Sequence, residues 1–185
     1  SLNAMSAQLV GVSLCVTPGR ACYIPLAHKG PQAQGGFDFG DGADNPAQGA
    51  PDQIPLHRAL ELLKPLLENP GVLKVGQNIK YDMLVLGRYG VGVAPVDDTM
   101  VISYVLECGQ HGHGMDELAR LHMGYDTIKF KDVAGTGKAQ VTFDHVDLDK
   151  ALDYAAEDAD VTLKLYKMLK PRLAAEHMTS VYETM

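Results

Sequence analysis

The segment Asp147–Leu169, DLDKALDYAAEDADVTLKLYKML, decides the fold class, because it is a long amphipathic helix in a chain of shorter elements. At about 100° per residue, its apolar side chains gather in one broad arc and its charged residues take the opposite side. The pattern predicts a helix that ends near Pro171 and packs lengthwise against a core. The residues of the apolar arc are Ala151, Leu152, Ala155, Ala159, Val161, Thr162, Leu163, Leu165 and Tyr166.

Asp158 interrupts this apolar arc, and Tyr154 lies one turn before it on the same strip. A carboxylate on a core-facing strip is costly unless it is paired, hydrogen-bonded or bound to a metal. Two interpretations stay open. Either Asp158 caps a neighbouring loop or pairs with a buried arginine, or it belongs to a functional site. The neighbouring acids Glu157 and Asp160 are interpreted as surface charge.

Short strands and helices are expected before this helix. Ala7–Val16 and Ala21–Leu26 alternate apolar with small or polar residues around Pro18-Gly19, which predicts a β-hairpin. A hairpin followed by alternating strands and helices predicts an α/β sheet with helices on both faces. Residues 29–53 and 124–146 are expected to be mostly loop. The other expected elements are a helix over Leu56–Glu68 with a kink or break at Pro65, strands over Val72–Gly76 and Val93–Asp97, a helix capped by Asn78, and helices over Thr99–Leu106 and Met115–Met123.

A second acid, Asp82, lies in the first turn of the helix that Asn78 is expected to cap. This turn follows the end of a strand, where ligands of open α/β sheets tend to bind. An acid at a helix N-terminus is also favoured by the helix dipole alone, so a structural role stays open.

The motif His111-Gly112-His113 is interpreted as a Gly-rich loop rather than a metal pair, because we find no Cys or carboxylate at a ligand-like spacing. The three cysteines, Cys15, Cys22 and Cys108, form no C-x-x-C pair. They are interpreted as small buried hydrophobic residues in a reducing cytosol.

Composition and charge limit the classes of protein to which this chain can belong. The 46% hydrophobic and 21% charged residues are typical of a globular protein, and 185 residues fit one domain. No apolar run approaches the ~18 residues of a membrane span, so we expect a cytoplasmic protein without a membrane partner. The net charge of −7 argues against a simple DNA-binding surface, because such surfaces are usually basic. An acidic protein without a polyanion partner is the alternative that composition favours.

Three motifs together resemble the 3′→5′ exonuclease domain of bacterial family-A DNA polymerases, the DNA polymerase I type. They are Lys74–Asp82 (KVGQNIKYD), Asp98–Met100 (DTM) and Tyr154–Thr162 (YAAEDADVT). The similarity extends through Leu9–His28, Ala59–Glu68 and Thr127–Phe143, which leaves the 29–53 stretch as the main part not covered. The resemblance implies a ribonuclease-H-like fold, with a mixed α/β sheet flanked by helices, in a single domain over residues 1–185.

The resemblance also implies hydrolysis of the last phosphodiester at a DNA 3′ end, with two Mg²⁺ or Mn²⁺ ions and release of a nucleoside monophosphate. Asp82 matches the acid of the family's second motif, and Tyr154 and Asp158 match the Tyr-x-x-x-Asp of its third. Asp158 and Asp82 are therefore the expected metal ligands, and Tyr154 would orient the attacking water. The implied partners are a single-stranded DNA 3′ end and a polymerase domain in the parent chain. The residues expected to contact the terminal nucleotides are Leu2, Gln77, Asn78, Tyr81 and Phe130.

The sequence departs from the family's pattern at its beginning. The family places an Asp-x-Glu pair, which anchors both metals, immediately before the position of Ser1-Leu2, and neither acid is present. We interpret the chain as N-terminally truncated, with the first, central strand missing from the sheet. We expect very low nuclease activity. We also expect the gap to be filled by a residual segment, by a rearranged sheet, or by another chain in a strand-exchanged or edge-paired homodimer.

Two other functions stay open. One is a non-catalytic, exonuclease-like domain that serves as a structural or DNA-binding platform. The retained acids argue against it, because a decayed site has no reason to keep Asp158 on an apolar strip. The other is an exonuclease of the same superfamily that acts on RNA. The similarity of Thr127–Phe143 to the DNA polymerase domain argues against this alternative.

Overall fold

The computed structural model describes residues 3–29 and 51–184, so Leu2 and most of the expected 29–53 loop lie outside it. None of the helices in these two ranges combines the length and apolar character that crossing a membrane requires. The strands are β1 (Gly11–Thr17), β2 (Arg20–Pro25), β3 (Lys74–Gly76) and β4 (Val96–Asp98). The helices are α1 (Leu56–Leu67), α2 (Ile79–Gly87), α3 (Thr99–Glu107), α4 (Met115–Met123), α5 (Phe130–Ala134), α6 (Leu148–Ala175) and α7 (Thr179–Glu183), with 3-10 turns η1 (Gly137–Ala139) and η2 (Phe143–His145).

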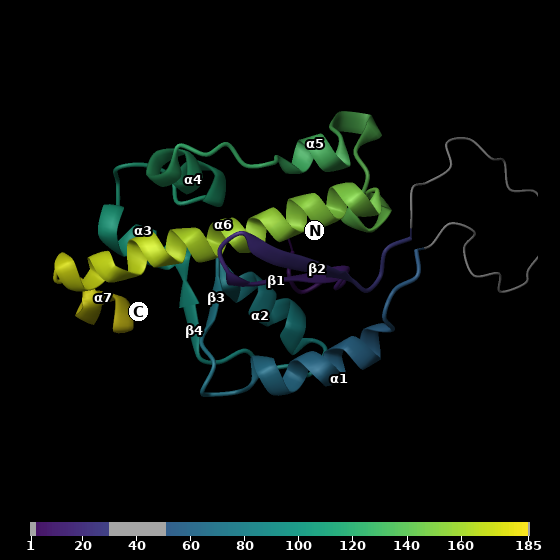
Figure 1. Ribbon diagram of the computed structural model, residues 1–185, viewed down its shortest axis with the longest axis horizontal. Coiled ribbons are helices and arrows are strands. Elements are labelled where there is room, and N and C mark those ends of the chain that lie inside the picture. Colours follow the sequence, from purple (N-terminus) through teal and green to yellow (C-terminus); the bar gives the residue numbers. More distant parts are fainter. Residues whose placement is uncertain (1–2, 30–50, 185) are drawn as a thin grey trace, which may run out of the picture.

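Helix α6 runs through the middle of the molecule, with α4 and α5 along one side and the β1–β2 hairpin along another (Figure 1). It also contacts β3, α3 and α7. The predicted apolar arc is buried at Ala151, Ala155, Val161 and Leu165, whereas Leu152 is exposed. The helix therefore buries the face that the sequence pattern indicates. The main core consists of Ile102, Val105, Leu118, Ala119, Val161, Leu165, Leu169 and Leu173.

The predicted end of this helix near Pro171 is wrong, because α6 continues to Ala175. A proline inside a helix removes one backbone hydrogen bond and crowds the preceding turn. Burial on both sides offsets that cost, since Leu169 and Leu173 are both in the core. Arg172 also forms ion pairs with Glu107 and Glu176. Tertiary contacts thus override the local signal, and α1 likewise continues past Pro65.

The strands form two separate two-stranded sheets within the described residues. β1 and β2 form the predicted antiparallel hairpin, with Gly11 opposite Pro25. β3 and β4 are parallel, with Gly76 opposite Asp98. Within the described residues, the hairpin and the parallel pair are therefore not joined by strand pairing. Helix α6 packs against strands of both sheets.

Other details differ from the sequence-based expectations. The stretch 124–146 contains α5 and the two 3-10 turns, and the short helix α7 has no signal in the sequence pattern. Cys22 and Cys108 are exposed rather than buried. Asp160 is not free surface charge, because its carboxylate accepts a hydrogen bond from the Gly19 amide at 2.6 Å and so holds the hairpin turn against α6.

Gln53 and His28 close the base of the stretch that we expected to be a long loop. The Gln53 side chain accepts a hydrogen bond from the His28 amide at 3.0 Å and donates one to the His28 carbonyl at 2.8 Å. Lys29 is held in the same place, since its amide donates to the Asp144 carbonyl and its ammonium pairs with the Asp144 carboxylate. The two described ends of this stretch are therefore fixed to each other and to the η2 turn.

The carboxylate of Asp98 caps two helices at once. Its Oδ1 accepts hydrogen bonds from the Asn78 and Met100 amides, and its Oδ2 accepts one from the Ile79 amide, all at 2.9 Å. Asn78 is the N-cap residue of α2, as predicted. It adopts a left-handed backbone with φ of 58°, and its side chain makes no capping hydrogen bond, so the Asp98 carboxylate takes that role. Asp98 therefore fixes α2 and α3 at the carboxyl ends of β3 and β4.

Replacing Asp98 by alanine should lower the free energy of unfolding by about 2–3 kcal/mol, because one helix cap contributes roughly 0.5–2 kcal/mol and two are lost. Urea unfolding followed by circular dichroism measures the change. Asp126→Ala is the matched control, since Asp126 is an exposed loop residue. Equal stability losses for the two variants would contradict the double-cap interpretation.

Candidate active site

Asp158 lies half-buried on α6, and its Oδ1 atom is buried without a hydrogen-bond partner among the described residues. Burial is the main reason that the pKa of Asp158 rises to about 7. A hydrogen bond from the Tyr154 hydroxyl opposes this rise, and the charges of Glu157 and Asp116 add to it. The alternative in which Asp158 pairs with a buried arginine is not realised within the described residues. One carboxylate oxygen of Asp158 is therefore buried without a hydrogen-bond partner among the described residues.

Tyr154 is packed between Asp158 and two phenylalanines. Its ring centroid lies 6.1 Å from that of Phe130 and 5.9 Å from that of Phe143. Burial, followed by the nearby Asp158 charge, raises the pKa of Tyr154 well above its usual value. The hydroxyl therefore stays protonated at neutral pH and can donate to the Asp158 carboxylate. Phe130 is 40% exposed, so its ring is available to a ligand.

Asp82 lies in the first turn of α2, just beyond the Asp98 cap. Desolvation by the surrounding protein raises its pKa to about 6, and the Asp98 charge contributes in the same direction. Water reaches the Asp82 side chain, which is exposed in this chain, so solvent moderates the shift. Asp82 is thus a carboxylate in the first turn of α2, and the Asp98 cap fixes the position of that turn. Asp82 forms no ion pair within the part of the chain that the structure describes.

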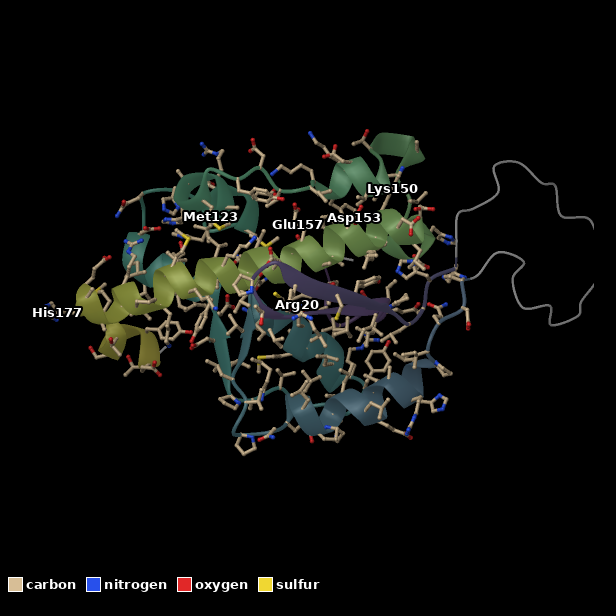
Figure 2. The ribbon with its side chains drawn as sticks, viewed as in Figure 1. Arg20, Met123, Lys150, Asp153, Glu157 and His177 are labelled. Carbon is tan, nitrogen blue, oxygen red and sulfur yellow. The ribbon has the colours of Figure 1, made fainter. Side chains whose placement is uncertain are left out.

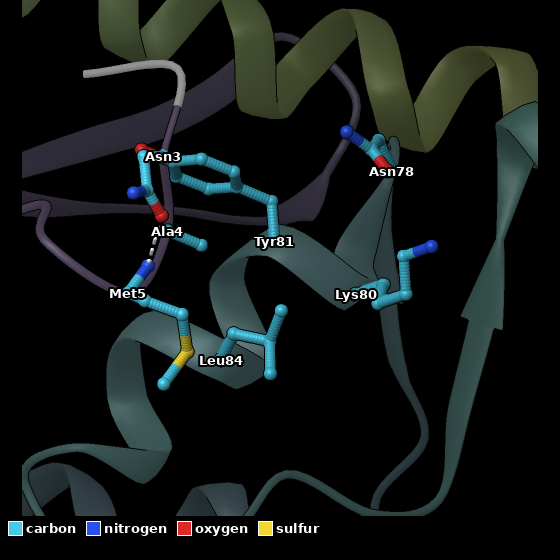
Figure 3. A pocket seen from close by; sticks show the side chains of 7 residues that line it. All are labelled: Asn3, Ala4, Met5, Asn78, Lys80, Tyr81 and Leu84. Atoms are coloured by element: carbon cyan, nitrogen blue, oxygen red, sulfur yellow. Dashed lines mark hydrogen bonds between the residues drawn. The ribbon is translucent and has the colours of Figure 1, made fainter.

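Two of the residues expected to contact a nucleotide lie on one open groove of about 370 Å³ (Figure 3). Asn78 and Tyr81 line one part of it, and the segment before β1 lines the other. The full lining is Asn3, Ala4, Met5, Asn78, Lys80, Tyr81 and Leu84.

Gln77 points elsewhere, because its amide donates to the His113 carbonyl at 2.8 Å and its side-chain oxygen accepts from the Thr99 hydroxyl. It positions the start of α2 and is not placed on the groove. Phe130 lies with Tyr154, and Leu2 falls outside the described residues. The candidate residues therefore form two groups, one on α2 and one on α5 and α6. Both groups lie beside the parallel pair, since strand β4 contacts α2 and strand β3 contacts α6.

Glu157 has a role that sequence reasoning missed. Figure 2 labels it on α6, next to Asp158 in the chain. Its carboxylate accepts hydrogen bonds from the Tyr125 hydroxyl and from the Ile128 amide, the latter at 2.7 Å. These bonds hold the segment that leads into Phe130. No local pattern signals this role, because its partners are about 30 residues away in sequence.

The arrangement defines a ribonuclease-H-like α/β domain with an acid–tyrosine cluster on its long helix. A family model described as 3′-5′ exonuclease matches residues 1–174. The chain therefore belongs to the 3′-5′ exonuclease family found in DNA polymerase I proteins.

The curated relatives are much longer than this chain. DNA polymerase I of Rhizobium leguminosarum is 54% identical over 99% of the chain, and that of Pseudomonas aeruginosa is 43% identical over 95% of it. The chain spans only 18% of the length of each of these relatives.

Solved structures support the fold. A nuclease in its apo form superposes with a TM-score of 0.65 at 20% identity, covering 96% of this chain and 70% of that one. NrnC of Brucella melitensis superposes with a TM-score of 0.55 at 21% identity, covering 66% and 57% of the two chains.

The pKa of Asp158 predicts how stability depends on pH in metal-free buffer. Because the folded-state pKa is raised to about 7, folding favours the protonated form. That contribution is fully present below pH ~4 and is lost as the pH rises through about 7. Asp158→Asn should therefore gain stability relative to the unmodified chain, by on the order of 1–2 kcal/mol, between pH 5 and pH 8.

Urea unfolding at a series of pH values in EDTA measures this difference. Asp153→Asn is the control, because Asp153 is exposed on the same helix (Figure 2) and should leave the pH profile unchanged. Parallel pH profiles for Asp158→Asn and the unmodified chain would rule out the raised pKa.

Proposed function

We propose that this domain removes nucleotides one at a time from the 3′ end of single-stranded DNA by hydrolysis. The observation that carries the proposal is the buried, unpartnered Oδ1 of Asp158 beside the Tyr154 hydroxyl. A structural acid on an apolar strip would have its oxygens satisfied, whereas a metal ligand needs one free. The family membership is consistent with this chemistry.

The residues fit a divalent cation. Asp158 offers a free carboxylate oxygen, and Asp82 offers an exposed carboxylate at the end of β3 and the start of α2. Oxygen ligands of this kind suit Mg²⁺ and Mn²⁺. When bound, two such ions would make water a nucleophile at neutral pH and stabilise charge on the leaving oxygen. NrnC of Brucella melitensis, which has the same fold, has been solved with bound Mg²⁺.

The side chains of this chain would position the substrate and the attacking water. Tyr154, kept protonated by its raised pKa, would hold a water through its hydroxyl while it remains hydrogen-bonded to Asp158. Phe130, 40% exposed and in contact with Tyr154, would stack on a base, and Asn78 and Tyr81 would line the path of the strand. Stacking on aromatic rings is tolerant of sequence, as a general exonuclease requires.

The polymerase context is part of the proposal. Each DNA polymerase I relative is several times longer than this chain, so we propose that the domain acts beside a polymerase domain in its parent chain. In that setting the exonuclease would remove misincorporated nucleotides. A family-type Asp-x-Glu pair upstream of Ser1 would complete the metal site, and we propose that the chain without it is weakly active.

An exonuclease acting on RNA or on short oligonucleotides is a second candidate. NrnC of Brucella melitensis has been solved bound to pGG, and its fold matches this chain with a TM-score of 0.55. A matched pair of 5′-labelled oligonucleotides, one DNA and one RNA of the same sequence, distinguishes the candidates. Faster degradation of the RNA would favour the second one.

Asp158→Ala should lower the rate of nucleotide release by more than about 100-fold, since even outer-shell partners of a metal contribute 10–100-fold. The assay follows a 5′-labelled single-stranded DNA on a denaturing gel, with Mg²⁺ or Mn²⁺, in a chain extended upstream to include an Asp-x-Glu strand. Asp153→Ala is the matched control and should keep full activity. Full activity of Asp158→Ala would exclude the proposed site.

Tyr154→Phe should lower kcat by about 10–100-fold with little change in KM, because the lost hydroxyl orients water rather than substrate. The Phe130 and Phe143 contacts of the ring are retained in this variant, so its melting temperature should stay close to that of the unmodified chain. A large rise in KM with unchanged kcat would instead assign Tyr154 to nucleotide binding.

A further inference from the structure

A second group of ligand-type side chains lies at the other end of α6. Glu107 ends α3, His111 follows it in the loop, and His122 lies near the end of α4. The Oε2 atom of Glu107 is 2.9 Å from Nε2 of His111 and 3.1 Å from Nε2 of His122. Figure 2 labels Met123, the neighbour of His122, and His177, just beyond α6, which together locate this end of the molecule. Three elements therefore direct one ligand atom each at a common point.

Both ring nitrogens of His111 face hydrogen-bond acceptors. Its Nδ1 lies 2.7 Å from the carbonyl oxygen of Gly112, and its Nε2 lies 2.9 Å from the Glu107 carboxylate. Both partners are acceptors, whereas a neutral imidazole has one donor and one acceptor nitrogen. The ring is satisfied only as an imidazolium, or with a metal ion in place of the Nε2 proton.

Neighbouring groups hold His111 and Glu107 in orientations that suit metal binding. The Gly112 carbonyl accepts from His111 Nδ1, which fixes the tautomer whose Nε2 is free to bind. Arg172 donates to Oε1 of Glu107 and leaves Oε2 for the two histidines. Glu107 is only 7% exposed, so its orientation is fixed by packing as well.

The spacing of the three atoms suits zinc. All three ligand atoms lie within 4.8 Å of one another. Tetrahedral ligands at 2.0–2.1 Å from Zn²⁺ are about 3.3 Å apart, so small rotations of the rings would admit the ion. Two imidazoles and one carboxylate, with water in the fourth position, are a known zinc ligand set.

We propose that Glu107, His111 and His122 bind one Zn²⁺ or a similar imidazole-preferring divalent ion, separately from the exonuclease site. The ion would join the ends of α3 and α4 and, through Arg172, fix them to α6. Arg172 lies about 21 Å along α6 from Asp158 at 1.5 Å per residue, so the two sites share no ligand. The Arg172 charge opposes a cation, and with only three protein ligands we expect moderate rather than tight binding.

Our interpretation of His111-Gly112-His113 as a plain loop did not weigh the nearby carboxylate of Glu107. Glu107 precedes His111 by four residues, and the turn that follows the end of α3 brings the two side chains together. The third ligand, His122, comes from the next helix and is identified only in the fold.

The test is calorimetric titration of Zn²⁺ into the metal-free chain, in a background of Asp82→Asn and Asp158→Asn that removes the exonuclease acids. We expect one ion per chain, and at least about 10-fold weaker affinity after His111→Gln or His122→Gln. His57→Gln is the matched control, because His57 is exposed on α1 and should leave affinity unchanged. Zn²⁺ should also raise the melting temperature of the control but not of the two histidine variants.

The absence of Zn²⁺ binding, or equal affinity in all three histidine variants, would overturn the proposal. The cluster would then be a hydrogen-bonded network between the Glu107 carboxylate and two imidazole rings. If a histidine variant fails to fold, Co²⁺ binding to the chain with intact histidines is followed instead by NMR. Large contact shifts of the His111 and His122 ring signals would support the site, and the absence of such shifts from both rings would refute it. Loss of nuclease activity in Asp158→Ala bears on the other site and is independent of this result.

Discussion

Three backbone amides donate to the single carboxylate of Asp98, and the candidate active site depends on that geometry. The carboxylate lies at the end of β4, opposite Gly76 at the end of β3, and it completes the first turns of both α2 and α3. Asp82 in the first turn of α2 and Asn78 just before it therefore have fixed positions relative to the parallel strands. A negative charge at two helix N-termini is favourable for both helix dipoles. A further hydrogen bond, from the Asp98 amide to the Tyr182 hydroxyl, ties this junction to α7.

Helix α6 is the second constraint, because it carries a carboxylate on a face that otherwise buries apolar surface. Burial of Ala155 and Val161 on either side keeps Asp158 in place, and the same burial raises its pKa. The chain thus accepts a local cost at a position where a nonpolar residue would pack without penalty. Such local conflicts with the folding pattern are expected at functional sites.

Periodicity was sufficient to predict the hairpin, the helical face of α6 and the unusual position of Asp158 on it. These features depend on residues that are close in sequence. The N-cap position Asn78 was predicted, but the capping carboxylate was not, since Asp98 is 20 residues from Asn78 and no local pattern joins them. The end of α6 was misplaced for a similar reason, because the core contact of Leu173 and the ion pair of Arg172 with Glu107 are made across the fold. The Glu107–His122 contact and the role of Glu157 are likewise tertiary, so a single sequence offers little signal for them.

The two hydrogen bonds between His28 and Gln53, which we call the clamp, fix both ends of the connection between these residues. The fold of the domain therefore does not depend on the sequence of that connection. Two hydrogen bonds join the backbone of one residue to the side chain of the other, and Lys29 is anchored to Asp144 beside them. In general, the entropy cost of closing a loop rises only with the logarithm of its length, about 0.6 kcal/mol for each doubling. Evolution or engineering can therefore lengthen, shorten or replace this connection at small thermodynamic cost. The clamp makes it a natural insertion point, at which a fluorophore or an affinity module could be joined without disturbing the Asp158–Tyr154 pair or the Glu107, His111 and His122 group.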